Sequence, residues 1–340
     1  MAWKRLNDCA EMWDKISYSG EKKGDIVMAL SVDKSSENPY LGVVRQITKR
    51  EGSPDKPGFV DKSKLIIVSS EDLLSWKKVG DLKIKNINEV IKKLETEDSF
   101  FIGLEDPDII IDEKGFRHLY FTIAFKLKSR EGYYVYLGHA HGKDLNSLEA
   151  PSPVLSPILK ENIFGFKEIC FDFSKKGRHL AECGIMENKR EVSAMASVLS
   201  SGYDKGWEFS KIVFDPHKSK YEWCCGHASP CCFFIDEFLK YKNMKVGIMN
   251  GREKSKIVDG KKIYGKFRPG LFIYDDKKEK IVWVDEKPLF EDPLSTGITF
   301  ASDFIYLGDG EGILYAHVND SFVRAYKLKA DLLIKRLPKN

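Results

Sequence analysis

A chain of 340 residues can bury a sizeable core without disulfides or metals, and 12% aromatic and 31% charged residues are typical of a soluble globular protein. The 55 basic and 51 acidic residues leave a net charge of only +4, so no global field steers the chain toward nucleic acid. The sequence starts without an apolar run of signal-peptide length, and no segment reaches the roughly 18 apolar residues of a membrane helix. We therefore expect a cytoplasmic protein that binds neither nucleic acid nor membrane.

Short β-branched and aromatic runs follow one another along the chain, separated by Gly, Asp, Asn and Lys turns. In chain order they are DIVMALSV, KLIIVSS, DIIIDE, HLYFTIAF, YYVYLGHA, FKEICFDF, SAMASVLS, KVGIMNG, GLFIYDD, KIVWVDE, DFIYLGD and ILYAHV. Only residues 84–97, IKNINEVIKKLETE, have the apolar period of a helix. This order predicts an all-β protein with one short helical insertion.

A repeat organises these strands. Trp76 in SSEDLLSWKKVG and Trp207 in SSGYDKGWEFSK both follow a strand, a Ser-Ser pair and an acidic turn, and Leu148 holds the matching place between them. Two steps of about 65 residues divide the chain into close to five units. Such units fit a five-bladed β-propeller, whereas two packed β-sandwiches would not explain the period. We expect residues 1–340 to form one propeller domain.

The seven cysteines include two adjacent pairs in WCCGHASPCC. Cys225, His227 and Cys231 are candidate zinc ligands, but the paired CxxC spacing of a structural zinc site is missing. The pattern favours reduced, partly buried thiols over a metal site. We expect neither a metal nor a cofactor.

Carboxylates stand at the start of one predicted strand. GLEDPDIII places Glu105, Asp106 and Asp108 around Pro107, and proline is tolerated at the first position of a strand. The alternative interpretation is a proline turn flanked by acidic residues. In a propeller the inner strands line one axial channel, so polar residues from different blades would converge there.

A second acidic cluster, EICFDFSKKGRHLAECGIMENKR, carries Glu168 and Glu182 in apolar surroundings. A half-buried carboxylate is costly unless it is paired or does chemistry, and Lys167, Arg178 or Lys189 could pair with one. Two carboxyl groups that face a sugar ring can cleave a glycoside, one as proton donor and the other as base or nucleophile.

Several of these stretches resemble one family. GLEDPDIIIDEKGFRHLYFTIAF resembles the Gly-x-Glu-Asp-Pro-Arg strand of glycoside hydrolase family 130, the β-mannoside phosphorylases and hydrolases with five-bladed propellers. GHASPCCFF is similar to the family's Gly-x-x-Pro strand, KVGIMNGRE stands at its Tyr-His-Gly strand, and FRPGLFIYDD resembles its Tyr-Arg-x-Gly strand. The resemblance covers about residues 65–332 and implies a divergent member with a glycoside or oligosaccharide substrate.

The resemblance also implies roles for individual residues. By position, Asp106 matches the general acid that protonates the glycosidic oxygen, and Glu182 stands where a catalytic base could be. The residues expected to bind substrate are Glu105, Arg45, His227, Asn250, Arg268, Asp303 and Asp320.

Phosphate-binding donors of the family are replaced in this chain. The arginine of Glu-Asp-Pro-Arg is Asp108, and the His-Arg-Pro strand falls at AECGI, with Glu182 or Cys183. The histidine of Tyr-His-Gly is Asn250, and the tyrosine of Tyr-Arg-x-Gly is Phe267. Because phosphate recognition needs donors and positive charge, we expect hydrolysis of β-mannosides or manno-oligosaccharides rather than phosphorolysis.

Three alternatives stay open beside the hydrolase. They are a glycoside phosphorylase, another five-bladed glycosidase of the fructosidase or arabinanase kind, and a non-catalytic propeller that binds carbohydrate. LAECG and LEDP are weakly similar to fructosidase motifs, but RLNDCAEMW lacks the proline of the Asn-Asp-Pro nucleophile motif. The sequence leaves the oligomeric state open.

Overall fold

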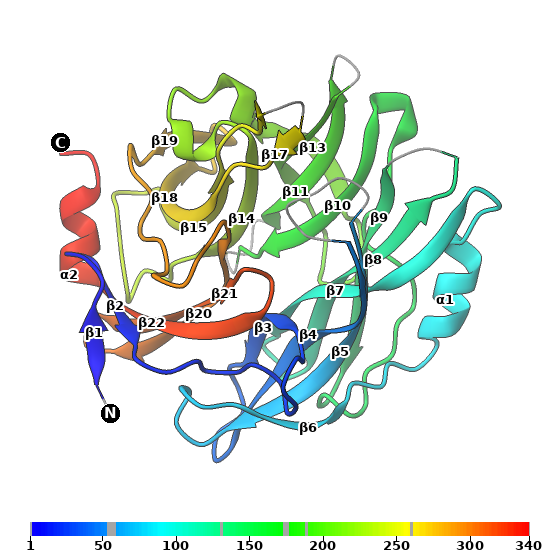
Figure 1. Cartoon of the computed structure of the whole chain (residues 1–340), viewed down its shortest axis with the longest axis horizontal. Coiled ribbons are helices and arrows are strands. Elements are labelled where there is room, and N and C mark those ends of the chain that lie inside the picture. The colour runs from blue at the N-terminus through cyan, green and yellow to red at the C-terminus, as the bar shows by residue number, and fades with distance from the viewer. Residues whose placement is uncertain are drawn as a thin grey trace.

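The computed structural model describes residues 2–52, 59–129, 132–172, 177–187, 190–258 and 261–339. They form an all-β, five-bladed propeller, and in Figure 1 the colours run once around its centre, from blue through green to red. The predicted fold is thereby confirmed.

Each blade is an antiparallel sheet whose strands follow one another outward from the axis. The innermost strands are β3 (Val27–Asp33), β7 (Ser99–Ile111), β10 (Ile163–Cys170), β14 (His227–Phe233) and β20 (Thr299–Gly308). The second strands are β4 (Tyr40–Glu51), β8 (Arg117–Leu127), β11 (Arg178–Glu187), β15 (Lys245–Arg252) and β21 (Glu311–Val318). The third strands are β5 (Val60–Ser70), β9 (Tyr133–Gly142), β12 (Arg190–Leu199), β18 (Phe267–Asp275) and β22 (Phe322–Lys329).

The outer edges of the blades are short. They are β6 (Lys77–Asp81), β13 (Glu208–Phe214) and β19 (Lys280–Val284), while the blade that begins with β7 ends on a bridge between His141 and Glu149. Trp76 and Trp207, which revealed the repeat, each come directly before such an edge strand. The hairpin of β16 (Lys256–Val258) and β17 (Lys261–Ile263) pairs within itself.

The last blade is completed by strands from the start of the chain. β2 (Ala10–Trp13) pairs with β22, with Ala10 opposite Leu328, and β1 (Trp3–Arg5) pairs with β2. Figure 1 shows both strands beside β22. Each inner strand contacts the inner strands of the two neighbouring blades, so the ring is closed.

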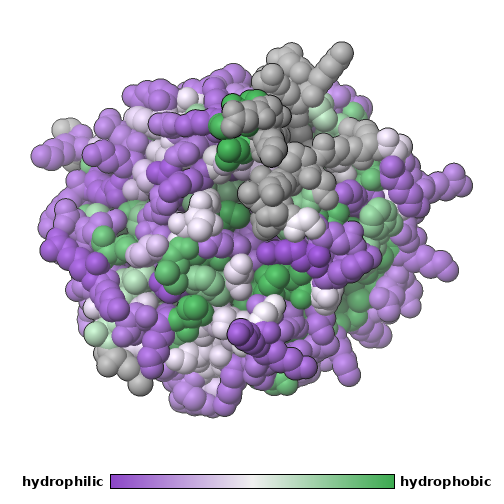
Figure 2. Space-filling model, in the orientation of Figure 1, coloured by the Kyte–Doolittle hydropathy of each residue, from purple (hydrophilic) through white to green (hydrophobic). Residues whose placement is uncertain are grey.

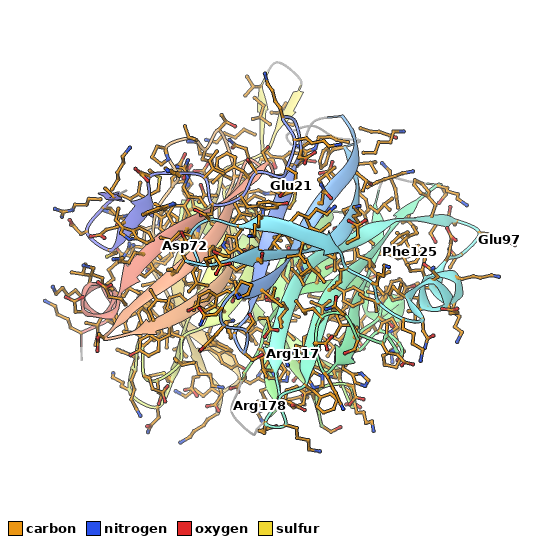
Figure 3. All side chains as sticks on the ribbon, turned by 90° about the horizontal axis from the view of Figure 1, so that it is seen from below. Glu21, Asp72, Glu97, Arg117, Phe125 and Arg178 are labelled. Atoms are coloured by element: carbon orange, nitrogen blue, oxygen red, sulfur yellow. The ribbon has the colours of Figure 1, made fainter. Side chains whose placement is uncertain are left out.

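The core is divided into layers between neighbouring blades. Of the buried apolar clusters among the described residues, five each join residues of two adjacent blades. One example is Phe125, labelled in Figure 3, which packs with Val43 and Leu65 of the preceding blade. Arg117, also labelled there, binds Asp33 at the end of β3, with 3.0 Å between Nε and Oδ2. The face in Figure 2 is mostly hydrophilic, with hydrophobic residues in small groups.

The helices are short and lie outside the ring. α1 (Ile87–Leu94) falls within the expected helical insertion, and its buried Val90 packs on the layer between the first two blades. A second helix, α2 (Ala330–Leu333), was not expected from the sequence because four residues show no period. The 3-10 turns are η1 (Leu159–Glu161), η2 (Pro216–Lys218), η3 (Glu222–Cys224) and η4 (Ile334–Arg336).

Candidate active site

All five inner strands carry a β-bulge at a matching point. The ladder to the second strand shifts between Met28 and Ser31, Glu105 and Asp108, Lys167 and Ile169, Pro230 and Cys232, and Ala301 and Asp303. Within three of these bulges Ala29, Asp106 and Glu168 have positive φ angles of 53°, 46° and 39°. A bulge re-aims a side chain, and strained backbone of this kind clusters at functional sites.

Pro107 was expected at the first position of its strand, but it lies inside β7, in the bulge. A bulge tolerates proline for the same reason that a strand end does, since no ladder hydrogen bond is lost there.

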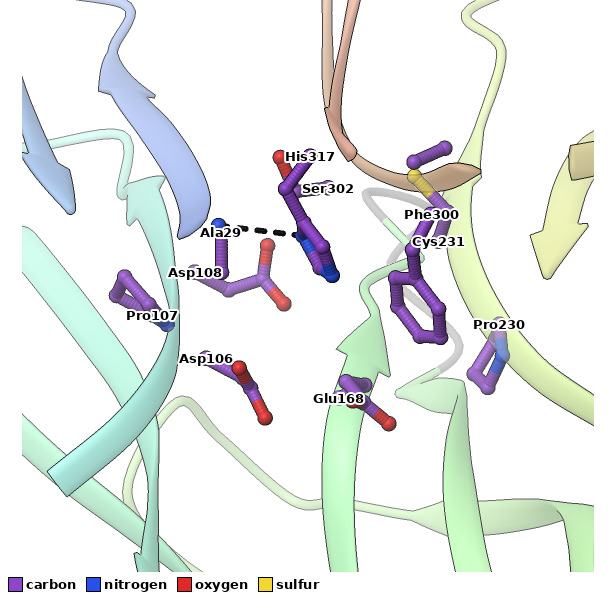
Figure 4. Close-up of a pocket in the computed structure, with 11 residues that line it drawn as sticks. Ala29, Asp106, Pro107, Asp108, Glu168, Pro230, Cys231, Phe300, Ser302 and His317 are labelled. Atoms are coloured by element: carbon purple, nitrogen blue, oxygen red, sulfur yellow. Dashed lines mark hydrogen bonds between the residues drawn. The ribbon is translucent and has the colours of Figure 1, made fainter. Parts of the chain in front are cut away.

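A small cavity lies among the bulges, and we call it the axial niche. It is lined by residues that include Asp106, Asp108, Glu168, Phe300 and His317. Figure 4 shows Asp106 and Glu168 on separate strands, facing the same space. The niche encloses about 20 Å³, which admits one water molecule but no pyranose ring. A sugar would therefore have to lie over its mouth.

Arg45 on β4 joins the two acidic residues of β7. Its Nη2 lies 2.7 Å from Glu105 Oε1 and its Nη1 lies 3.2 Å from Asp106 Oδ1. Burial and the charge of Asp106 raise the pKa of Glu105 to about 7, although Arg45 opposes the shift. Burial also pushes the pKa of Asp106 upward, but Arg45, Lys167 and His317 outweigh it and hold that pKa below its ordinary value. We call the carboxyl groups of Glu105 and Asp106, together with Arg45, the Arg45 pair. This pair takes up a proton near neutrality.

Lys167 on β10 joins a second pair of carboxyl groups. Its Nζ lies 3.0 Å from Glu168 Oε1 and 3.6 Å from Glu182 Oε1. Burial raises the pKa of Glu168 well above its ordinary value, and so do the charge of Glu182 and a hydrogen bond between the two carboxyl groups. These causes all favour the protonated form of Glu168. Of the predicted ion-pair partners, Lys167 is the one that the described residues confirm for Glu182, while Lys189 lies outside them.

We call the carboxyl groups of Glu168 and Glu182, together with Lys167, the Lys167 pair. Hydrogen bonds from β14 hold this pair in place. His227 Nε2 lies 3.0 Å from Glu182 Oε2, and the Ser229 hydroxyl donates to Glu168 Oε2 at 2.8 Å. Burial lowers the pKa of His227 well below its ordinary value, and the charges of Arg252 and Lys167 add to the effect. A neutral His227 can donate a hydrogen bond to Glu182 without bringing a charge.

Two carboxylates of the closing blade, Asp303 and Asp320, bind other groups of the protein. Asp303 accepts the backbone N–H of Val32 at 2.8 Å and an N–H of Lys34 at 2.7 Å, and it does not line the niche. Asp320 Oδ1 lies 3.1 Å from Nε2 of His317, whose Nδ1 accepts the N–H of Ala29 at 3.3 Å. Asp320 thus orients a histidine that does line the niche.

Asn250 and Arg268 also have partners within the protein. The Asn250 amide is fully buried and makes two hydrogen bonds to the backbone of Ala301, at 2.9 and 2.7 Å, so it joins β15 to the inner strand β20. Arg268 on β18 forms ion pairs with Glu253 and Glu291. Neither residue lines the niche.

The predicted residues that meet near the niche are Asp106, Glu105, Arg45, Glu182 and His227. The pocket-facing carboxyl of the second cluster is Glu168, whereas Glu182 stands behind it with 1% of its side chain exposed. His317 was missed altogether, although a histidine inside the apolar run ILYAHV is a signal that could have found it.

Of the three candidate zinc ligands, His227 contacts Glu182 and Cys231 lines the niche, whereas Cys225 does not line it. All seven cysteines are free thiols, and the Cys225 thiol donates to the Glu222 carbonyl. Across the described ranges, no group of three His, Cys, Asp or Glu side chains is placed to hold a metal ion. In the same ranges, no helix is long and apolar enough to cross a membrane.

Comparison with known proteins supports the fold. No protein-family profile and no curated protein matches the sequence. Among solved structures, β-1,2-mannobiose phosphorylase from Listeria innocua, in complex with β-1,2-mannobiose, is similar with a TM-score of 0.67 and 13% identity over 98% of both chains. A mannose phosphorylase from Leishmania mexicana, in complex with phosphate, has a TM-score of 0.58 and 14% identity over 97% of this chain and 92% of its own.

A third similar structure comes from work on the GH130 family of mannoside phosphorylases and its glycoside hydrolases that target β-1,2 mannosidic linkages in Candida mannan. It has a TM-score of 0.68 and 14% identity, and the match covers 95% of this chain and 94% of the other. At these identities the likeness shows a GH130-like fold.

Proposed function

We propose that this protein is a glycoside hydrolase acting on β-mannosides or manno-oligosaccharides. The observation that carries the proposal is the niche itself, where Asp106 and Glu168, one carboxyl group from each of two pairs on adjacent blades, face room for one water. Glycoside hydrolysis needs one carboxyl as proton donor and another to activate water. The β-mannoside class is supported by the similar structures and by the sequence resemblance.

Charge in the niche favours water over phosphate as the second substrate. Arg45 binds Glu105 and Asp106, and Lys167 already serves two carboxyl groups. A phosphate would have to compete with these carboxylates for both cations, whereas a phosphate site normally offers unopposed donors.

Asp106 is the proposed proton donor. It lines the niche, and the pair to which it belongs binds its proton near pH 7, so the proton can be given up and regained in each cycle. A sugar ring over the mouth would take Asp106 out of water and raise its pKa, shifting the proton of the pair toward it.

Glu168 and Glu182 together form the proposed base. Glu168 would accept a proton from the niche water at one oxygen and pass its own proton through the hydrogen bond to Glu182. Glu182, expected from the sequence to be the base, then acts through Glu168. Lys167 stays charged throughout, since its three acidic neighbours outweigh burial and raise its pKa well above the ordinary value.

Substrate turnover tests the function. We expect the protein to release mannose from a β-linked mannobiose without phosphate, and Asp106→Asn to reduce this at least about 100-fold. A strict need for phosphate with mannose 1-phosphate as product would instead show a phosphorylase. Cleavage of fructosides or arabinans alone would point to another five-bladed glycosidase, and sugar binding without turnover of any glycoside to a binding protein.

The roles of the two carboxyls are separable. A specific observation favours their exchange, because in the free protein the pKa of Glu168 is raised and that of Asp106 is lowered. Loss of the acid should spare 4-nitrophenyl β-mannoside, whose leaving group needs no proton, while loss of the base should be rescued by azide. We expect the first pattern for Asp106→Asn and the second for Glu168→Gln; the reverse would exchange the roles.

A further inference from the structure

A second cavity lies on the propeller axis, beyond the niche. It encloses about 310 Å³ and touches the inner strands after their bulges, at residues such as Ile110, Ile169 and Asp303. Asp108 and Cys231 line both cavities, while Asp106 and Glu168 line only the niche. The larger cavity, which we call the distal cavity, is therefore separate from the candidate catalytic carboxyls.

The wall of the distal cavity is mainly apolar. It includes five aromatic rings, Tyr40, Phe171, Phe233, Phe304 and Tyr306, and aliphatic side chains from all five blades. A dry cavity of about 150 Å³ lined by such residues binds benzene, and small-molecule sites begin at about 300 Å³. The volume therefore suits a molecule of two rings.

The charged or acidic side chains of the distal cavity are Lys34, Asp108 and Asp303, and Tyr40 and Tyr306 add hydroxyl groups to its lining. The Asp303 carboxylate is already occupied, because it binds Lys34 and accepts the N–H groups of Val32 and Phe304. The ammonium of Lys34 has three N–H donors, and one of them donates to Asp303. Burial and the charge of Asp303 raise the pKa of Asp108 well above its ordinary value, although Lys34 opposes the shift, and this favours the protonated form, which can donate a hydrogen bond.

These polar groups restrict the chemistry of a ligand. The ammonium of Lys34 and the tyrosine hydroxyls can donate, so they suit an oxygen that accepts hydrogen bonds. An anion would be repelled by Asp303, which lies 2.7 Å from the same ammonium. A sugar would leave most of its hydroxyl groups against apolar side chains without partners, which is costly.

We propose that the distal cavity is a second ligand site, which takes a neutral two-ring molecule with a hydroxyl or carbonyl oxygen bound by Lys34. Ile235, which lines the distal cavity, is 39% exposed although it is aliphatic. The assignment is independent of the proposed hydrolase, since it uses neither Asp106 nor Glu168.

Binding of 2-naphthol, followed by its fluorescence, tests the site. We expect one molecule per chain, binding at least tenfold weaker for 2-naphthalenesulfonate, and no displacement by methyl β-mannoside. Asp106→Asn should bind 2-naphthol as the wild type does. Displacement by the mannoside, or equal binding of the sulfonate, would overturn the proposal.

Two variants and one structure locate the binding. Ile305→Phe, which narrows the cavity, should abolish 2-naphthol binding, and Lys34→Met should weaken it about tenfold while leaving naphthalene binding unchanged. Should either variant fail to fold, a wild-type crystal soaked with 6-bromo-2-naphthol gives the answer directly. A bromine signal between Ile110 and Phe304 supports the site, and its absence there contradicts it.

Discussion

The Arg45 pair and the Lys167 pair have the same composition, two carboxyl groups and one cation, yet they hold their protons differently. Arg45 reaches its two carboxyl groups with separate nitrogens, and together with Lys167 and His317 it holds the pKa of Asp106 below its ordinary value. In the Lys167 pair, burial and the charge of Glu182 raise the pKa of Glu168 well above its ordinary value although Lys167 lies beside it. The surroundings of each carboxyl group, rather than the number of charges in the pair, decide the direction of its pKa shift.

Removal of the shared cation should have the largest effect on stability. We expect Lys167→Met to lower the free energy of unfolding by about 3 to 5 kcal/mol in denaturant melts, because it leaves buried carboxyl groups uncompensated. Lys49→Met is the matched control, since its pair with Glu51 is exposed, and it should change stability by less than about 1 kcal/mol. Equal losses would mean that the Lys167 pair is not held by its cation.

The Arg45 pair should make stability depend on pH. The fold raises the pKa of Glu105 from 4.5 to about 7, so the folded state binds this proton more tightly than the unfolded state. The resulting stabilisation is fully present below pH 4.5 and is lost as pH rises through 7, a change of about 3 kcal/mol. The glutamine of Glu105→Gln cannot ionise. Between pH 4.5 and 8 its free energy of unfolding should therefore fall by about 3 kcal/mol less than that of the wild type, measured by unfolding at several pH values. Glu37→Gln, at an exposed site, should follow the wild type.

A change of cation at constant charge isolates the fork of Arg45. Arg45→Lys should lower the free energy of unfolding by about 2 kcal/mol, because a single ammonium cannot replace both guanidinium contacts. It should also shift the limb of the pH–activity profile that lies near pH 7. Arg50→Lys, which breaks a similar fork to Asp61, should cost as much stability and leave the profile in place. If the limb near pH 7 shifts in both variants, the shift follows from lost stability and not from the titration of the Arg45 pair.

The smallest effect concerns the Lys167 pair. Ser229→Ala removes a hydrogen bond to Glu168 and should cost about 1 kcal/mol, seen in denaturant melts. Ser63→Ala removes a hydroxyl that donates to the Leu104 carbonyl and does not line the niche, and we expect a similar cost without any change in the pH profile of activity. If Ser229→Ala leaves that profile unchanged as well, Glu168 is not the group that titrates during turnover.

The fold was predictable because it follows from spacing. Short strands and a period of about 65 residues need only the printed sequence, and both Trp76 and Trp207 precede outer strands as the repeat requires. The helix was expected over a longer range than Ile87–Leu94, since helix ends depend on local caps.

The site was predictable only in part, because bulges break the alternation of a strand. Glu168 faces the niche from a bulge that sequence alternation does not show, so Glu182 was expected to be the reacting group. Asn250 was expected to bind substrate, but its amide is buried and makes its hydrogen bonds to the backbone of Ala301. Asp108 was expected to repel phosphate as a charge, but burial and the charge of Asp303 raise its pKa well above the ordinary value, which favours the neutral form.

The pairing of β2 with β22 has a consequence for folding. Ala10 and Leu328 are separated by almost the whole chain, so this ladder closes a very long loop, and contacts of such separation form slowly. Four blades can pair from neighbouring segments, but the fifth must wait for strands from both ends. During synthesis, β2 would therefore remain without its partner until β22 has emerged, and a label that occupies β2 would hinder ring closure without touching the niche.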